Sequence, residues 1–305
     1  MACAFVVSAI TLALPLCIRY ITQNLLAPGT PQALTHIYLM GAFMLALVIL
    51  YTACNAFVTY QGHVMGARME GDMRNELFEH YQKLSFSFYD EQRTAQLMTR
   101  ISNDSFDLSE LYHHGPEDII ISLLNFIGAS IILININLKL GLILLLFIPI
   151  MGVYAFCFSK RMRRAMRKSN DRIGDINTQV EDTLSGIRVV QSFTNEEIET
   201  KKFAHENSRF VASRKEGYKS EAYFYDGLIC FTQLMTLAVV IFGAVAIVKG
   251  LLDLADLLTF LLYIVIIIEP IQRLGNFARL YQEGITGFER FMEVLEIEPD
   301  IVGTK

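Results

Sequence analysis

Few side chains in this sequence have the types and spacing that metal chemistry needs. His113 and His114 are adjacent and could offer two imidazole nitrogens to a metal ion, but no third ligand lies near them in the sequence. Five cysteines lie inside apolar blocks and form neither a CxxC pair nor a Cys/His cluster: Cys3, Cys17, Cys54, Cys157 and Cys230. They are expected to be small packing residues, so no metal site is predicted.

Four polar side chains inside or beside long apolar stretches could instead contact a polar solute. Arg19 either extends its charge to an interface or lines a polar cavity. Glu269 either contacts a substrate or pairs with a nearby arginine or cavity water, and Arg273 follows it. Asn125 could form a hydrogen bond between helices. Arg19, Asn125, Glu269 and Arg273 are therefore the possible pathway residues.

The composition around these side chains indicates a membrane protein. Of the 305 residues, 53% are hydrophobic and 19% are charged, whereas an ordinary soluble domain has about 25% charged residues. The apolar residues form long blocks with the charges gathered between them, and the net charge of −5 does not suggest nucleic-acid binding.

The long apolar blocks predict six transmembrane helices, because about 20 apolar residues cross a bilayer. The first block has no basic region before it, so it is interpreted as a span and not as a signal peptide. The predicted spans cover about 1–22, 34–62, 117–137, 139–159, 222–248 and 254–278.

The connections between the spans predict their orientation. Three connections are short and carry at most one Lys or Arg each. His63 to Asp118 is 56 residues with five Lys or Arg, and Ser159 to Asp226 is 68 residues with 14. Positive charge stays in the cytoplasm, so the long connections and both termini are predicted to be cytoplasmic.

The two long connections are predicted to be helical hairpins. Apolar and charged residues alternate at helical spacing over Met65 to Leu84 and Asn177 to Phe210, and long loops without structure are uncommon. Gly62-x-x-x-Gly66 is expected to allow close helix packing. Asp104 is expected to form a helix-surface pair with Arg100, four residues earlier.

Each long connection also carries a distinctive pattern near its middle. The first contains Arg74-x-x-Leu77-Phe78, then Leu84-Ser85-x-x-Phe88-Tyr89-Asp90 and Arg93-Thr94. The second contains Glu181-Asp182-x-Leu184-Ser185-Gly186-Ile187-Arg188-Val189-Val190-Gln191-Ser192-Phe193. With these patterns in this order, and with six spans, the chain resembles the transmembrane domain of ABC exporters of the multidrug and lipid-flippase type (type I exporter fold).

The resemblance implies a fold and a set of docking residues. Residues 1–295 would form one all-α membrane domain, in which six transmembrane helices extend into the cytoplasm as two long helical hairpins with coupling helices at the tips. Each coupling helix would dock into a groove on an ATPase domain, with aromatic anchors and flanking charges. The alternative is that Phe88 and Tyr89 pack only within their own hairpin. Carried over by position, the coupling residues are Phe88, Tyr89, Asp90, Glu91 and Gln92 at the first tip, and Gly186, Ile187, Arg188, Val189, Val190 and Phe193 at the second.

The ATPase itself is not expected in this chain. A Walker A loop needs Gly-x-x-x-x-Gly-Lys-Ser/Thr, and the sequence has no Gly-Lys dipeptide. No catalytic or cofactor-binding residue is predicted, and ATP and Mg²⁺ would bind in a missing nucleotide-binding domain. Residues 296–305 are interpreted as the start of a linker to that domain, so we expect a truncated chain that does not hydrolyse ATP alone.

The resemblance also implies partners. The chain is expected to be a multi-pass protein of the plasma membrane that pairs with a second transmembrane domain and with nucleotide-binding domains, in contact with the lipid bilayer. The full-length protein would be an ATP-hydrolysing translocase that exports a small amphipathic drug, lipid or peptide. The alternatives are an ATP-independent carrier or channel, or a membrane scaffold.

Overall fold

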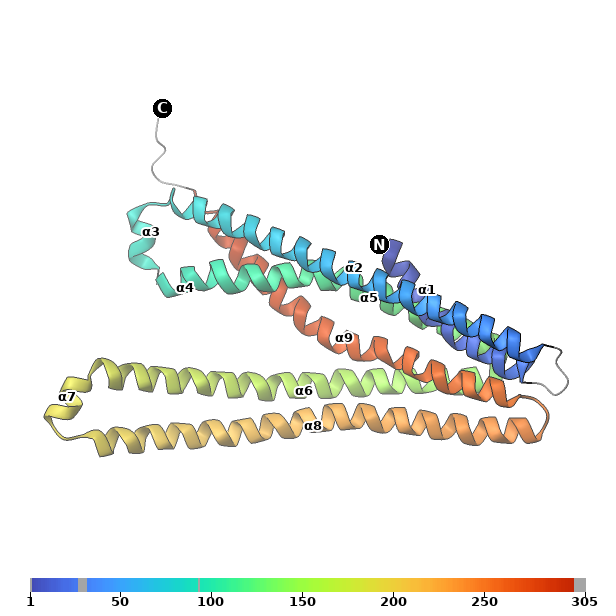
Figure 1. Ribbon diagram of the computed structural model, residues 1–305. Coiled ribbons are helices and arrows are strands. Elements are labelled where there is room, and N and C mark those ends of the chain that lie inside the picture. Colours follow the sequence, from blue (N-terminus) through green and yellow to red (C-terminus); the bar gives the residue numbers. More distant parts are fainter. Residues whose placement is uncertain (1, 27–31, 93, 299–305) are drawn as a thin grey trace, which may run out of the picture. The chain divides into compact units, whose positions relative to one another are not determined.

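The computed structural model describes residues 2–26, 32–92 and 94–298, and these residues are almost entirely helical. Over these residues nine α-helices and two π-helical turns follow one another without a strand (Figure 1). They are α1 (Ala2–Tyr20), η1 (Ile21–Leu25), α2 (Ala33–Tyr81), α3 (Phe86–Glu91), α4 (Thr94–Thr99), η2 (Arg100–Asp104), α5 (Ser105–Ile136), α6 (Leu138–Ser185), α7 (Ile187–Ser192), α8 (Glu196–Val248) and α9 (Leu254–Leu295). The end of the expected linker, 299–305, lies outside the described residues.

Six of the helical stretches are long and apolar enough to cross a membrane, which confirms the predicted number of spans. Helices α2, α6 and α8 contain 49, 48 and 53 residues, far more than the about 20 residues that cross a bilayer. The spans therefore continue as helices into the long connections. The first hairpin (residues 63–118) has α3 at its tip, and the second hairpin (residues 159–226) has α7.

Ion pairs along single helices lie on the surfaces of the hairpin legs. Glu70 pairs with Arg74 on α2 at 2.5 Å, and Glu197 pairs with Lys201 on α8 at 2.7 Å. Each acidic residue precedes its basic partner by four residues, which is the favourable order along a helix. The legs thus combine continuous backbone hydrogen bonding with paired surface charges.

The chain divides into two compact units, Met1–Ile143 with Ala238–Lys305, and Leu144–Leu237. In the first unit, α9 packs most extensively against α5, and α1 contacts α2, α5 and α9. Phe260, Tyr263, Ile264 and Ile267 of α9 are almost completely buried at 3, 4 and 7 residue spacings, which is the periodicity of one helix face. The Tyr263 hydroxyl donates a hydrogen bond to the carbonyl oxygen of Leu12, so the buried phenol is satisfied.

The C-terminal part of α9 is fastened to the π-helical turn η2. Arg290 pairs with the buried carboxylate of Asp104 at 3.3 Å, and Arg100 pairs with Glu293 at 3.4 Å. A Cβ at Gly287 would lie 2.8 Å from the carbonyl oxygen of Asp104, so only glycine allows this approach. Both residues of the expected pair, Arg100 and Asp104, thus form their ion pairs with α9.

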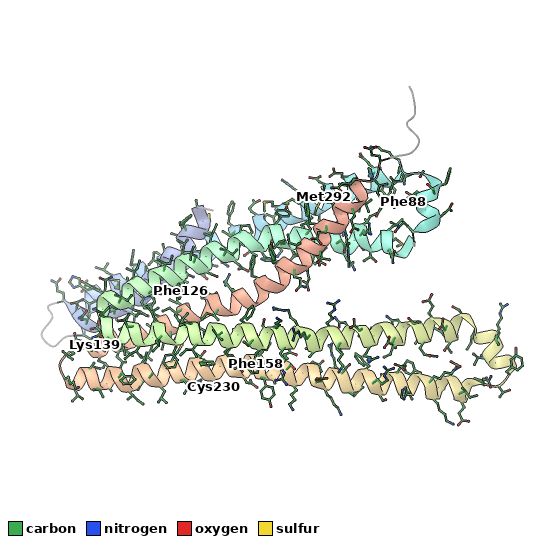
Figure 2. All side chains as sticks on the ribbon, turned by 180° about the vertical axis from the view of Figure 1, so that it is seen from behind. Phe88, Phe126, Lys139, Phe158, Cys230 and Met292 are labelled. Atoms are coloured by element: carbon green, nitrogen blue, oxygen red, sulfur yellow. The ribbon has the colours of Figure 1, made fainter. Side chains whose placement is uncertain are left out.

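In the second unit, α6 and α8 run side by side, as Figure 2 shows around Phe158 and Cys230. Tyr154 of α6 donates its hydroxyl hydrogen to the carbonyl oxygen of Tyr223 at 2.5 Å. Its ring stacks on Phe158 and meets Phe231 edge-on. A Cβ at Gly227 of α8 would collide with the Tyr154 hydroxyl, so the glycine makes room for this contact.

Candidate functional site

The first hairpin tip is a short helix held against its own hairpin. Its apolar support is a cluster of Leu77, Tyr81, Leu84, Leu97, Phe291 and Val294, and the partly buried Phe88 and Met292 pack against that cluster (Figure 2). The Phe88 ring lies 6.4 Å from the Tyr81 ring, and the Tyr89 hydroxyl donates to the Tyr81 carbonyl oxygen. Because Phe88 and Tyr89 both contact Tyr81 of α2, they hold α3 in one orientation on that helix.

The most exposed aromatic side chain of this tip is Phe86, at 84% exposure. Phe86 begins α3 and was not singled out by its sequence pattern. Tyr89 is 40% exposed, Asp90 is also exposed, and Gln92 is half-buried beyond the end of the helix. Glu91 is the last residue of α3. The tip therefore presents one large apolar side chain and one carboxylate beside a polar aromatic ring.

The second hairpin tip is built differently, with its apolar residues outward. Helix α6 ends at Ser185, Gly186 turns the chain, and α7 runs over the next six residues. Val189 and Phe193 are 62% and 72% exposed, and Arg188 is exposed beside them. Ile187 and Val190 are half-buried against the hairpin. Exposed apolar side chains of this size at the end of a hairpin are typical of an interaction surface.

Polar contacts below α7 hold the two legs of the second hairpin together. The Glu199 carboxylate of α8 accepts hydrogen bonds from Gln179 and Thr183 of α6, both at 3.0 Å, and pairs with Lys202 at 2.6 Å. Leu184, Ile187, Val190 and Phe203 line a depression beside these contacts. The depression lies between the helix that ends in the tip and the helix that leaves it.

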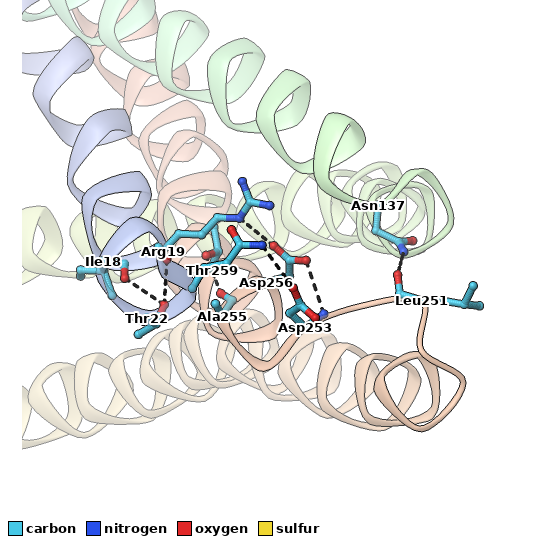
Figure 3. A network of polar contacts seen from close by, with 10 residues as sticks. Ile18, Arg19, Thr22, Asn137, Leu251, Asp253, Ala255, Asp256 and Thr259 are labelled. Carbon is cyan, nitrogen blue, oxygen red and sulfur yellow. Dashed lines mark hydrogen bonds and ion pairs between the residues drawn. The ribbon is translucent and has the colours of Figure 1, made fainter. Parts of the chain in front are cut away.

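The predicted pathway residue Arg19 lies in an ion pair near the start of α9 (Figure 3). Its Nε donates to Asp256 Oδ1 at 2.6 Å, and the two side chains are 30% and 11% exposed. The other carboxylate oxygen of Asp256 accepts from the backbone N–H of Asp253, and together these residues form the capping box of α9. Arg19 thus joins α1 to the cap of α9, so the structure adds an interhelical pair to the two alternatives considered for it.

The other predicted pathway residues are also close to partners or buried. Arg273 pairs with Glu269 on the same helix at 2.6 Å and with Asp118 of α5. This arrangement agrees with the expectation that Glu269 pairs with a nearby arginine. Asn125 of α5 is 4% exposed, and its side-chain oxygen has no hydrogen-bond partner in the structure. Arg273 therefore connects α5 to α9, and Asn125 keeps an unused acceptor among apolar helices.

The expectation that His113 and His114 have no third ligand nearby is wrong, because the fold brings another histidine to them. His63 of α2 lies beside His113 and His114 of α5, with 3.3 Å between His63 Nδ1 and His113 Nε2. The sequence contained a signal that was not used, since His63 directly follows one apolar run and the pair precedes another. Asp118 and Asp256, the ion-pair partners of Arg273 and Arg19, likewise lie at the edges of apolar runs.

Comparison with known sequences gives one family over most of the chain. The family model described as the ABC transporter transmembrane region matches residues 1–271. This range contains both hairpins and all six apolar stretches described above.

Individual relatives agree with this match. YwjA of Bacillus subtilis (strain 168), called an uncharacterized ABC transporter ATP-binding protein, is 37% identical over 292 residues, which are 95% of this chain and 50% of YwjA. An ATP-dependent lipid A-core flippase of Syntrophus aciditrophicus is 24% identical over 99% of this chain and 50% of its own length. YgaD of Bacillus subtilis, a putative multidrug export ATP-binding/permease protein, is 25% identical over 94% and 50%. The chain therefore spans about half the length of these curated relatives.

Proposed function

The chain belongs to the family of ABC transporter transmembrane regions, and we propose that it forms the substrate pathway of an ATP-driven exporter and couples that pathway to ATP-binding domains. It is a multi-pass membrane protein related to exporters and lipid flippases. The observation that carries the coupling proposal is the exposure of large apolar side chains on the short helices at both hairpin tips.

The two tips suit docking into grooves on ATP-binding domains. Phe86 of α3 and Val189 and Phe193 of α7 offer apolar surface that the described side chains of the hairpins leave exposed. A few buried apolar or aromatic anchors supply most of the free energy of a protein interface, with charges arranged around them. Asp90 and Arg188 stand beside these anchors as charges of opposite sign. On this proposal, Phe88 and Tyr89 set the angle of α3 while Phe86 enters the groove.

The remaining features of the proposed transporter follow from the family. Two such transmembrane domains would enclose one pathway, and the tips of each would dock into grooves on the ATP-binding domains. ATP with Mg²⁺ would bind to those domains, outside this chain. The names of the relatives, lipid A-core flippase and multidrug export protein, favour an amphipathic or lipid-like substrate moved outward. Asn125 Oδ1 is buried and unpaired, whereas Arg19, Glu269 and Arg273 are engaged in ion pairs.

Transport by the complete exporter in proteoliposomes tests this proposal. Phe86→Ala and Val189→Ala should each lower ATP-driven flux of an amphipathic substrate by about fivefold or more, because losing an interface anchor costs over about 1 kcal/mol. Phe106→Ala and Val211→Ala are matched controls, since these side chains are 49% and 42% exposed on hairpin legs away from the tips. The controls should leave flux unchanged.

Two results would count against the proposal. Equal loss of flux in tip and control variants would remove the docking role of the tips. Flux that persists after removal of ATP or of the ATP-binding domains would instead favour an ATP-independent carrier or channel, and no flux under any condition would favour a scaffold.

A further inference from the structure

Three histidines from two helices meet at the base of the first hairpin. His63 lies at the end of the apolar run of α2, and His113 and His114 lie just before the apolar run of α5. One nitrogen from each ring lies within 4.8 Å of the others. Among the residues that the structure describes, these three histidines are the one group of His, Cys, Asp or Glu side chains whose ligand atoms come this close together.

Gly62 on α2 makes the space in which this group forms. A Cβ at Gly62 would collide with the His113 ring, whereas a Cβ at Gly66 would be in ordinary contact, 3.6 Å from His113 Cβ. His113 is therefore pressed against the backbone of α2 and is only 4% exposed. The expected close packing at Gly62-x-x-x-Gly66 is confirmed, and the group that packs there is the imidazole ring of His113.

The spacing of the nitrogens matches that of ligands on one metal ion. Nδ1 of His63 and Nε2 of His113 are 3.3 Å apart. Two nitrogens bound to one tetrahedral zinc ion at about 2.0–2.1 Å are separated by about 3.3 Å. The ring of His63 is inclined by 67° to that of His113 and by 85° to that of His114, whereas the rings of His113 and His114 are inclined by 37° with their centroids 4.2 Å apart.

The surroundings supply the outer contacts that metal-binding imidazoles use. Nδ1 of His63 lies 2.7 Å from the carbonyl oxygen of Thr59, and Nε2 of His114 lies 3.5 Å from the Glu110 carboxylate. A carbonyl or carboxylate beside one ring nitrogen orients the ring and raises the basicity of the other nitrogen. With Nδ1 of His63 as the ligand, as the 3.3 Å spacing requires, the metal ion would replace the Thr59 contact, so the outer contact that is kept is the one between Glu110 and Nε2 of His114.

We propose that His63, His113 and His114 bind one borderline divalent transition-metal ion, with Zn²⁺ as the reference, and that the ion cross-links α2 to α5. Neutral imidazole is a preferred ligand for zinc, copper and nickel and a poor one for calcium or magnesium. Three protein ligands leave a fourth position for water or for Glu110. The exposed side chain of His63 gives the ion a route of entry from solvent.

Zinc binding to the purified full chain tests the proposal. The protein carries an affinity tag without histidine and is dialysed against buffered Zn²⁺, and bound metal is counted by mass spectrometry. We expect one zinc ion per chain and a rise in the melting temperature with Zn²⁺, because an ion that binds only the folded chain stabilises it. Mg²⁺ at the same concentration should produce neither effect.

The variants avoid His113, which is buried and packed against α2. His63→Gln and His114→Gln should each weaken zinc binding at least about tenfold and abolish the thermal shift. His36→Gln is the matched control, because His36 lies on the same helix and its Nδ1 also contacts the backbone carbonyl four residues earlier, at 3.1 Å. Zinc binding that is equal in the His63→Gln and His36→Gln chains, or absent from the unmodified chain, would overturn the proposal.

Discussion

At the scale of single residues, ion pairs between helices give the first unit its polar contacts. Arg19 and Asp256 join α1 to the start of α9, and Arg273 joins α9 to Asp118 of α5. Charges are costly at membrane depth, and losing one partner leaves the other uncompensated. Side chains that sequence reasoning treated as possible substrate contacts therefore also act between helices.

A double-mutant cycle measures the first of these pairs. Asp256→Asn removes the charge but keeps an oxygen that can accept from Asp253 N–H in the helix cap. Combined with Arg19→Gln in thermal unfolding experiments in detergent, it should give a coupling of about 0.5–3 kcal/mol. The control pair is Lys201 with Glu197, whose side chains are 75% and 81% exposed, and it should show little or no coupling. Similar coupling for both pairs would contradict a stabilising role for Arg19.

At the scale of helices, glycines decide where two neighbours can come close. The Tyr154 hydroxyl packs against Gly227 of α8, and the backbone of η2 packs against Gly287 of α9. Gly174 of α6 has open space around the position of a Cβ. The same substitution should therefore have opposite effects at different glycines.

Alanine substitutions in the second unit test this expectation. Gly227→Ala should lower the free energy of unfolding by about 1–3 kcal/mol, because Tyr154 must move away from α8. Gly174→Ala should raise it by up to about 1 kcal/mol, because alanine favours the helix more than glycine. Thermal unfolding of both variants gives the comparison, and destabilisation at both positions would show that close packing is not the cause.

At the scale of the whole molecule, the helices could be predicted from the sequence, whereas their partners could not. Apolar run length and helical spacing are local properties, so the six spans and the two long hairpins were correctly predicted. His63 and His113 are 50 residues apart, and Arg19 and Asp256 are 237 apart. Such contacts depend on which helix faces pack together, and a position at the edge of an apolar run, which His63, Asp118 and Asp256 all have, does not say which partner it meets. For the same reason the inward packing of Phe88 and the exposure of Phe86 could not be told apart beforehand.

The orientation predicted from charge can be tested in intact cells. In a background without the five native cysteines, Leu251→Cys and Phe193→Cys place thiols at exposed positions, between α8 and α9 and at the second tip. We expect a membrane-impermeant maleimide to label Leu251→Cys from outside, and Phe193→Cys only after permeabilisation, because the basic second connection should be cytoplasmic. The reverse pattern would mean that the charge rule assigns this chain the wrong orientation.

The π-helical turn η2 lies between the first tip and the span, and it affects how chain length sets the orientation of the tip. Each residue of an α-helix advances about 100° around the axis, and a π-helical turn holds one residue more than an α-helical turn. The five residues Arg100–Asp104 therefore turn the chain about as far around the axis as four α-helical residues would. Loss of one residue at this place would restore an unbroken α-helix and leave the tip facing nearly the same way, whereas loss of one residue elsewhere in α5 would rotate the tip by about 100°. The hairpin can thus lose one residue of chain length at η2 without changing the direction in which the tip docks.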